Sequence, residues 1–255
     1  MQEELKIRLI QLADKYETLS FLDEDPSQFT RWYTETRDVE LACFIAAMLA
    51  FGNRKQFIPK IREILTLADK SGGIYSWISK GKFKEEFICP LQPEKKFYRF
   101  YSYSDMQDFF CDLMSIVNSE QKSLGAYFKE IYISEENKGN KPLLSDLISS
   151  AFPNSAIVPK GKASANKRIH MLLRWLVRKN SAVDLGIWNW YSPADLIIPL
   201  DVHVMQEGQK LGLISEKASA NRKTAMALTA QLKEIWPEDP CKGDFALFGS
   251  GVNIN

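Results

Sequence analysis

The chain has 255 residues, of which 45% are hydrophobic and 25% charged, and its formal net charge is +1. That is enough apolar material to bury a core in one large domain or in two smaller lobes, but the overall charge does not indicate a polyanionic partner. No run of residues approaches the roughly 18 apolar residues of a membrane span, and the start MQEELKIRLI lacks the basic and apolar regions of a signal peptide. We therefore expect a cytoplasmic protein without a membrane partner.

Nearly every periodic segment repeats at the spacing of a helix, and no run shows the alternation of a β-strand. The sequence therefore predicts an all-α fold. The predicted helices cover, in chain order, residues 4–16, 39–51, 56–69, a segment that begins near Ser104, 124–133, 143–152, 165–179, 201–211, 219–235 and 244–249. Ser104 and Gln107 have the spacing of a capping box, and Gly212 follows the helix that begins at Asp201.

The cysteines and histidines are too few and too scattered for a metal site. The four cysteines form no C-x-x-C pair, and the chain has only two histidines, His170 and His203. We interpret the cysteines as reduced thiols that are buried or partly buried. The sequence predicts no metal and no cofactor.

Positive charge is concentrated in one part of the chain. No acidic residue occurs between Leu147 and Val183, whereas the rest of the chain is mildly acidic. This segment contains seven basic residues: Lys160, Lys162, Lys167, Arg168, Arg174, Arg178 and Lys179. Such segregation predicts a surface for phosphate groups, and the alternative is an ordinary solvated helix face.

The predicted helix 165–179 has two faces. At about 100° per residue, Lys167, Arg174 and Arg178 lie on one side, and apolar residues such as Leu173 lie on the other. We refer to the three basic residues as the cationic stripe. The loop before them, PKGKASAN, adds Lys160 and Lys162 beside Gly161, whose freedom in φ would let backbone N–H groups face an anion.

A family resemblance rests on the segment IIPLDVHVMQEGQKLGLI, residues 197–214. Its Pro-hydrophobic-Asp-x-His run and Leu-Gly-Leu ending resemble helix-hairpin-helix DNA glycosylases of the endonuclease III and 8-oxoguanine glycosylase kind. DFALFGSG and VELACFIAAMLAFGNR resemble the closing helix and an early core helix of that fold. Together with KRIHMLLRWLVR, the pattern is also similar to a bacterial family placed near those glycosylases, whose activity is not established.

The resemblance implies a single glycosylase-like unit over residues 1–255, with two helical lobes flanking a cleft. We expect one lobe over residues 1–35 plus 140–255 and the other over 36–139. It also implies that Asp201 faces the deoxyribose of a flipped nucleotide and stabilises the positive charge that develops as the base departs. His203 would orient a group or contact a phosphate. The alternative is that Asp201 is an ordinary N-cap.

The hairpin departs from the glycosylase pattern Gly-x-Gly-x-Lys-Thr-Ala. Gly161 matches the second glycine and Ser164 the threonine, but Pro159 replaces the first glycine and Ala163 the nucleophilic lysine. Lys167, one turn further on, is an alternative source of the amine, and a simple phosphate contact by Lys167 is the other interpretation. The resemblance implies phosphate contacts by Lys160, Gly161, Lys162, Ser164, Arg168, Arg174, Arg178 and His203.

Aromatic residues beyond the basic segment are candidates for stacking on a base. Trp188 lies in the insert SAVDLGIWNWYSPADL, and Phe245 and Phe248 lie in the last predicted helix. They would form a base pocket, and the alternative is that they pack in the core. The iron-sulfur module of endonuclease III is absent, because only Cys241 follows Asp201.

These observations predict a monomeric glycosylase that acts on a damaged or mispaired base in double-stranded DNA. We expect hydrolysis that depends on Asp201 and water, in preference to lyase chemistry. The alternative hypothesis is a non-catalytic nucleic-acid-binding module on the same scaffold, as Ala163 at the lysine position would suggest. A helical protein-interaction scaffold is a third hypothesis, against which the acid-free basic segment argues.

Overall fold

A computed structural model describes residues 1–23 and 25–252. The chain is mostly helical and its described part contains a single two-stranded sheet, which confirms the all-α prediction. It forms two compact units: a terminal unit, Met1–Asp25 with Gly161–Asn255, and a central unit, Pro26–Lys160. The unit boundaries therefore lie at residues 25/26 and 160/161, and the lobe boundaries expected from the sequence are 35/36 and 139/140.

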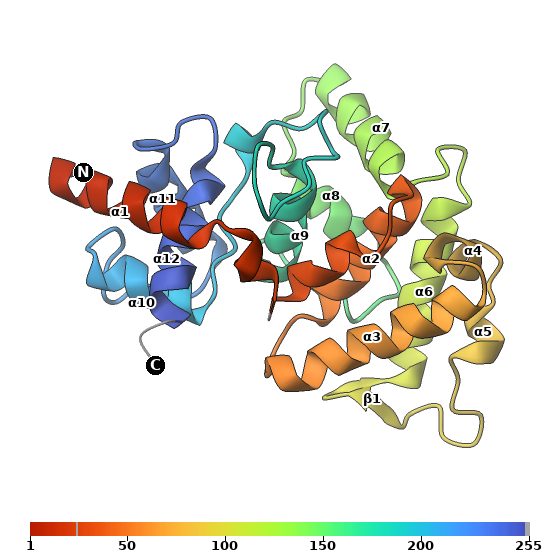
Figure 1. Ribbon diagram of the computed structural model, residues 1–255. Coiled ribbons are helices and arrows are strands. Elements are labelled where there is room, and N and C mark those ends of the chain that lie inside the picture. Colours follow the sequence, from red (N-terminus) through yellow and green to blue (C-terminus); the bar gives the residue numbers. More distant parts are fainter. Residues whose placement is uncertain (24, 253–255) are drawn as a thin grey trace. The chain divides into compact units, whose positions relative to one another are not determined.

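The terminal unit combines the first helix with the last third of the chain (Figure 1). Its elements are α1 (Glu3–Tyr16), η1 (Leu19–Leu22), α9 (Lys167–Val177), η3 (Pro193–Asp195), α10 (Val202–Lys210), α11 (Arg222–Lys233), η4 (Pro240–Lys242) and α12 (Gly243–Val252), where η denotes a 3-10 helix. Helix α12 contacts both α1 and α10. The two ends of the chain thus build one unit together.

The central unit holds the remaining elements. They are η2 (Pro26–Arg31), α2 (Thr36–Leu49), α3 (Arg54–Lys70), α4 (Ile74–Ser79), α5 (Phe83–Glu86), β1 (Lys96–Tyr98), β2 (Tyr101–Ser102), α6 (Tyr103–Val117), α7 (Leu124–Asn137) and α8 (Leu144–Ser150). The hairpin of β1 and β2 was not predicted, because two strands of three and two residues are too short to show alternation. The short helices α4 and α5 were also not predicted, because they are too short to show helical periodicity.

Helix α2 is the core of the central unit. Every residue from Val39 to Leu49 is buried, as its nearly unbroken apolar sequence predicts. Two carboxylates at its start serve neighbouring helices rather than α2 itself. Asp38 accepts a hydrogen bond from Tyr75 N (2.7 Å) at the start of α4, and Glu40 accepts one from Gly125 N (3.1 Å) at the start of α7. N–H groups at the starts of two helices are thereby satisfied.

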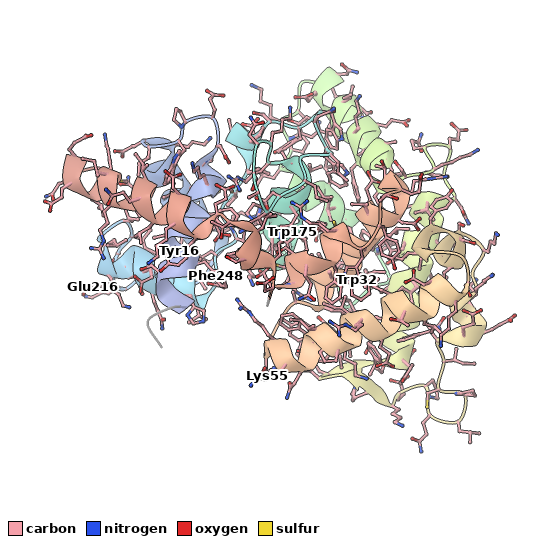
Figure 2. All side chains as sticks on the ribbon, in the orientation of Figure 1. Tyr16, Trp32, Lys55, Trp175, Glu216 and Phe248 are labelled. Carbon is pink, nitrogen blue, oxygen red and sulfur yellow. The ribbon has the colours of Figure 1, made fainter. Side chains whose placement is uncertain are left out.

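The close approach of α1 and α12 depends on a glycine. A Cβ atom on Gly249 would lie 2.3 Å from Cγ of Tyr16, so any larger residue would push the helices apart. Figure 2 labels Tyr16 on α1 and Phe248 on α12. Tyr16 also packs against the buried cluster of Leu22, Val183 and Phe245. This packing holds the first helix of the chain to the last.

Helix α6 begins two residues earlier than predicted. Its N-cap is Ser102, and Ser102 and Asp105 form the capping box, so the prediction of Ser104 with Gln107 was wrong. Gln107 instead donates hydrogen bonds to the carbonyl oxygens of Phe83 (2.9 Å) and Phe87 (2.6 Å). Ser102 with Asp105 and Ser104 with Gln107 both have the spacing of a capping box. Because β2 ends at Ser102, the helix begins with the earlier pair.

The four cysteines are free thiols, two buried (Cys43 and Cys241) and two partly buried (Cys89 and Cys111), as predicted. Among the described residues, no helix combines the length and the apolar character needed to cross a bilayer.

Candidate functional site

Asp201 is the N-cap of α10, as the sequence predicts. A buried segment, residues 196–200, leads to it, and Ile198 N within that segment donates to Thr229 Oγ1 on α11 (3.1 Å). One carboxylate oxygen of Asp201, Oδ1, accepts a hydrogen bond from Val204 N (2.9 Å). The side chain is 17% exposed. The cap fixes one oxygen, which leaves Oδ2 for another partner.

That second partner is Lys167. Its Nζ lies 3.8 Å from Asp201 Oδ2, and its side chain is 32% exposed. Lys167 is the first residue of α9, so the pair joins the starts of two helices that are 34 positions apart in the sequence. The sequence could propose each residue but could not bring them together, because the irregular segment 178–192 separates α9 from η3. The two predicted catalytic residues therefore form one partly exposed site.

The loop before α9 is compact and exposed at its tip. Gly161 has φ +96° with open space where a Cβ would lie, and Lys162, Ala163 and Ser164 are exposed. Asn166 ends the loop in the left-handed region (φ 45°), which Asn tolerates better than most residues. Its Nδ2 donates to Gly161 O (3.3 Å), and its buried Oδ1 has no hydrogen-bond partner among the described residues. We call residues 161–166 the hairpin loop.

The cationic stripe does not exist as a surface. Arg174 and Arg178 are 3% and 1% exposed, and both are held by carboxylates. Arg174 pairs with Asp184 (Nε–Oδ1, 3.3 Å) and Asp244. Arg178 pairs with Asp184 (2.5 Å), Asp239 (2.8 Å) and Glu17 (3.0 Å). The prediction that these two arginines contact phosphate was therefore wrong: all nine residues from Ile169 to Val177 are buried.

This buried ion-pair network extends toward the Lys167–Asp201 pair. Burial raises the pKa of Asp244 to about 6, opposed by Arg174, and the charge of Asp201 raises the pKa further while Lys167 lowers it. Burial also raises the pKa of Asp184, against the opposing effect of the two arginines. Charge on the partly exposed pair is thus coupled to a carboxyl group inside the protein.

A family model described as protein of unknown function (DUF2400) matches residues 25–253. The chain belongs to this family. No curated protein and no solved structure matches the chain. Membership in DUF2400 carries no activity, so a function for this family member has to be argued from its site.

Lys160 was also predicted to contact phosphate, but its ammonium group is already engaged. Lys160 Nζ donates to the carbonyl oxygens of Ser149 (2.9 Å) and Phe152, at the C-terminal end of α8. Cations are favourable at that end of a helix, because its carbonyl groups lack partners. Burial lowers the pKa of Lys160. We assign Lys160 to capping α8, which corrects the prediction.

The predicted base pocket is mostly core. Trp188 and Phe245 are 1% and 0% exposed, so neither is available to stack on a base, and that prediction was wrong. Trp188 stacks on Trp190 (5.6 Å between centroids), and Phe245 lies under the guanidinium of Arg174 (4.4 Å). Phe248 is only partly buried.

Two further predicted residues are partly exposed. His203, two residues after Asp201, makes an edge contact with the Phe248 ring at 6.1 Å, and Arg168 follows Lys167 in the first turn of α9. Their roles as phosphate contacts stay predictions. Among the described residues no group of three His, Cys, Asp or Glu side chains is placed to hold a metal ion.

Sequence reasoning missed the segment that lies beside the hairpin loop. Ser164 forms an isolated antiparallel bridge with Asn221, and Arg222 N donates to Ala163 O (2.9 Å). The segment therefore places the start of α11 against the loop. Its signal in the sequence is a second acid-free stretch, from Lys217 to Lys233, which contains four basic residues.

Proposed function

We propose that this protein is a DNA glycosylase that hydrolyses the N-glycosidic bond of a damaged or mispaired base in double-stranded DNA. One observation carries the proposal: a partly exposed carboxylate at a helix N-terminus, Asp201, lies 3.8 Å from the amine of Lys167. The resemblance of residues 197–214 to helix-hairpin-helix glycosylases supports the same conclusion. On this proposal the fold is glycosylase-like and residues 161–166 form its DNA-binding hairpin.

The proposed reaction breaks the bond between the sugar carbon C1′ and the base nitrogen. The base leaves with the bonding electrons and receives a proton from solvent, and positive charge develops on the sugar. Asp201 stabilises that charge, because a fixed carboxylate acts without reorganisation when the charge appears. A water molecule then adds to C1′ and releases its second proton, which leaves free base and an abasic sugar. A nucleotide flipped from the duplex gives Asp201 access to C1′.

The hairpin loop supplies groups for the DNA backbone. Lys162 and Ser164 are exposed, and Gly161 lets the chain approach a ligand closely, since nothing lies within 4 Å of its would-be Cβ. The buried Oδ1 of Asn166 supports a site that receives a group from outside the chain, because buried polar atoms rarely lack a partner.

The position of Lys167 favours a second candidate, a glycosylase with lyase activity. An amine 3.8 Å from the carboxylate is within reach of the same sugar carbon. In that reaction the neutral amine attacks C1′, and the base leaves with the bonding electrons and takes up one proton from Nζ. The other Nζ proton moves to the ring oxygen as the sugar opens to an imine with Nζ. Borohydride reduces this imine to a stable covalent adduct. The hydrolytic reaction gives no such adduct.

The proposal is tested by release of free base from duplexes that carry a panel of lesions and mismatches. Asp201→Asn is the informative variant, because Asn is as good an N-cap as Asp and keeps the start of α10 while removing the charge. We expect release by wild type and a loss of at least about 100-fold in Asp201→Asn. Asp195→Asn, at an exposed carboxylate in η3, is the matched control and should behave as wild type.

Two outcomes would contradict the proposal. No release by wild type from any duplex, with salt-dependent DNA binding retained, would identify the chain as a non-catalytic nucleic-acid-binding module, in line with the exposed Ala163 at the expected lysine position. Equal release by wild type and Asp201→Asn would remove Asp201 from the chemistry. Borohydride trapping of wild type but not of Lys167→Gln would assign the lyase mechanism.

A further inference from the structure

Two acid-free segments meet on the surface of the terminal unit. The hairpin loop belongs to the first, residues 147–183, and the start of α11 belongs to the second, residues 217–233. The backbone bridge between Ser164 and Asn221 and the hydrogen bond from Arg222 N to Ala163 O fix one segment against the other. Their side chains are therefore held in a defined arrangement.

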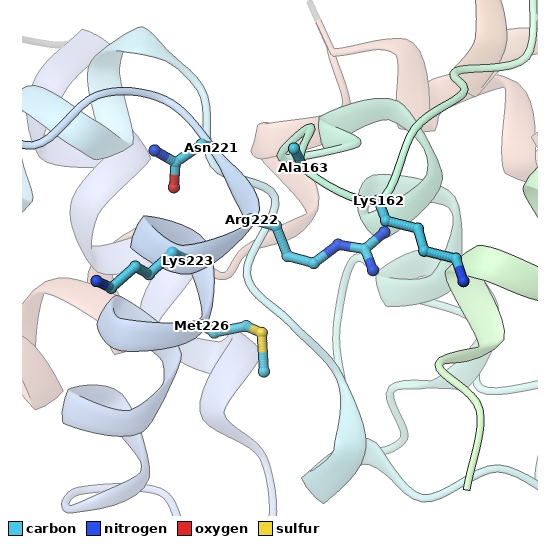
Figure 3. Close-up of a pocket in the computed structure, with 6 residues that line it drawn as sticks. All are labelled: Lys162, Ala163, Asn221, Arg222, Lys223 and Met226. Carbon is cyan, nitrogen blue, oxygen red and sulfur yellow. The ribbon is translucent and has the colours of Figure 1, made fainter. Parts of the chain in front are cut away.

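An open pocket of about 520 Å³ lies at this junction. Figure 3 shows the residues that line it, which are Lys162, Ala163, Asn221, Arg222, Lys223 and Met226. Three of the six are basic and none is acidic. The side chain of Arg222 extends from the start of α11 toward the hairpin loop (Figure 3), so basic side chains from both segments line the pocket.

The lysines of this pocket differ from the arginines of the predicted cationic stripe in exposure and in ion pairing. Arg174 and Arg178 are buried and neutralised by carboxylates, whereas Lys162 and Lys223 are exposed and form no ion pair with a described residue. Two backbone N–H groups at the start of α11 are already bonded, because Asn221 Oδ1 accepts from Thr224 N (2.9 Å) and Arg222 N donates to Ala163 O. A ligand would therefore be held mainly by the basic side chains.

We infer that this pocket binds phosphodiester groups of a nucleic-acid strand, and that α11 thus contributes a DNA contact beside the hairpin loop. The choice of DNA as the ligand rests on the proposed function. Three arguments support this inference. The pocket is open to solvent, and its basic side chains are of the kind that contact phosphate oxygens in protein–DNA complexes. Lys162 also lies only five residues before Lys167 of the candidate reaction centre. Met226, 47% exposed at the pocket, offers an apolar contact to a sugar or base.

The salt dependence of binding to an undamaged duplex tests the inference without requiring catalysis. Each phosphate contact contributes about 0.9 to the slope of log K against log salt concentration. We expect Lys162→Gln and Lys223→Gln each to lower that slope by about 0.9 and to weaken binding to all sequences equally. Lys233→Gln is the matched control, because Lys233 is exposed at the other end of the same helix. The inference is wrong if Lys162→Gln and Lys223→Gln both match Lys233→Gln in affinity and slope.

Lysine acetylation followed by mass spectrometry identifies the source of the phosphate. We expect duplex DNA to protect Lys162 and Lys223 in the wild-type protein, while Lys233 stays reactive. The comparison uses about 1 mM inorganic phosphate, which is well above the non-specific dissociation constants of about 10⁻⁴–10⁻⁶ M for DNA. Protection of these lysines by inorganic phosphate but not by DNA would contradict a nucleic-acid contact. Failure of the proposed function can be told apart from failure of this inference. If the wild-type protein releases no base, but the variants show these slope changes and DNA protects the two lysines, the α11 contact stands and the glycosylase proposal does not.

Discussion

Replacement of Arg174 by methionine tests whether the buried ion-pair network stabilises the terminal unit. The arginine side chain is 4% exposed, binds Asp184 and Asp244, and lies over the ring of Phe245. Methionine fills much of the same volume but removes the charge. Asp244 then loses the arginine to which it is bonded, while it stays buried.

Removal of one partner from a buried ion pair costs about 3–5 kcal/mol, because the remaining charge is left without compensation. For a unit of this size, with an m value of about 2 kcal/mol/M, the urea midpoint should fall by about 1.5–2.5 M. Tryptophan fluorescence is a suitable probe, since four of the six tryptophans, Trp175, Trp188, Trp190 and Trp236, lie in the terminal unit. The loss should be smaller at pH 5 than at pH 8, because Asp244 can then take up a proton.

Lys179→Met is the control for this prediction. Lys179 is exposed and adjacent to the network, so the substitution should change the free energy of unfolding by no more than about 0.5 kcal/mol. If Arg174→Met stays within about 1 kcal/mol of wild type at pH 8, the reasoning about an uncompensated buried carboxylate is refuted.

Three further predictions concern stability. Because burial raises the pKa of Asp244 to about 6, the native state holds a proton that the unfolded chain releases near pH 4. The free energy of unfolding should therefore fall by up to about 3 kcal/mol as pH rises from 4 to 7, and urea titrations of Asp244→Asn should show no such fall. Gly249→Ala should destabilise the terminal unit by about 1–3 kcal/mol, since the added methyl group meets the ring of Tyr16, and a thermal midpoint equal to wild type would contradict that packing. Ser102→Ala should cost about 1 kcal/mol by loss of the α6 cap, whereas Ser104→Ala should be nearly neutral; the reverse order in urea denaturation would restore the later cap.

Local signals in the sequence were sufficient for several parts of the structure. The acid before an apolar turn and the glycine after it located the start and end of α10, and Asp201 caps that helix as expected. The all-round apolar character of residues 39–49 indicated a buried helix. Both features depend on residues within one or two turns of each other, which is the range over which a pattern is informative.

The cationic stripe shows where local reasoning failed. A helical wheel places Arg174 and Arg178 together correctly, but it treats the opposite face as the only buried one. Three of the carboxylates that neutralise them, Asp184, Asp239 and Asp244, come later in the chain, and a fourth, Glu17, comes near its start. The carboxylate partners of these arginines therefore lie outside the acid-free segment. In the same way, Lys167 and Asp201 are 34 positions apart, which is too far for a local pattern to indicate the pairing that defines the candidate site.

The single-turnover rate of base release, with enzyme in saturating excess over lesion-bearing duplex, tests the role of Asp201 most directly because it separates chemistry from binding. We predict a measurable rate for wild type, a rate at least about 100-fold lower for Asp201→Asn, and equal affinity of both proteins for the duplex. A rate for Asp201→Asn equal to that of wild type, or no release by wild type at saturation, would contradict the account.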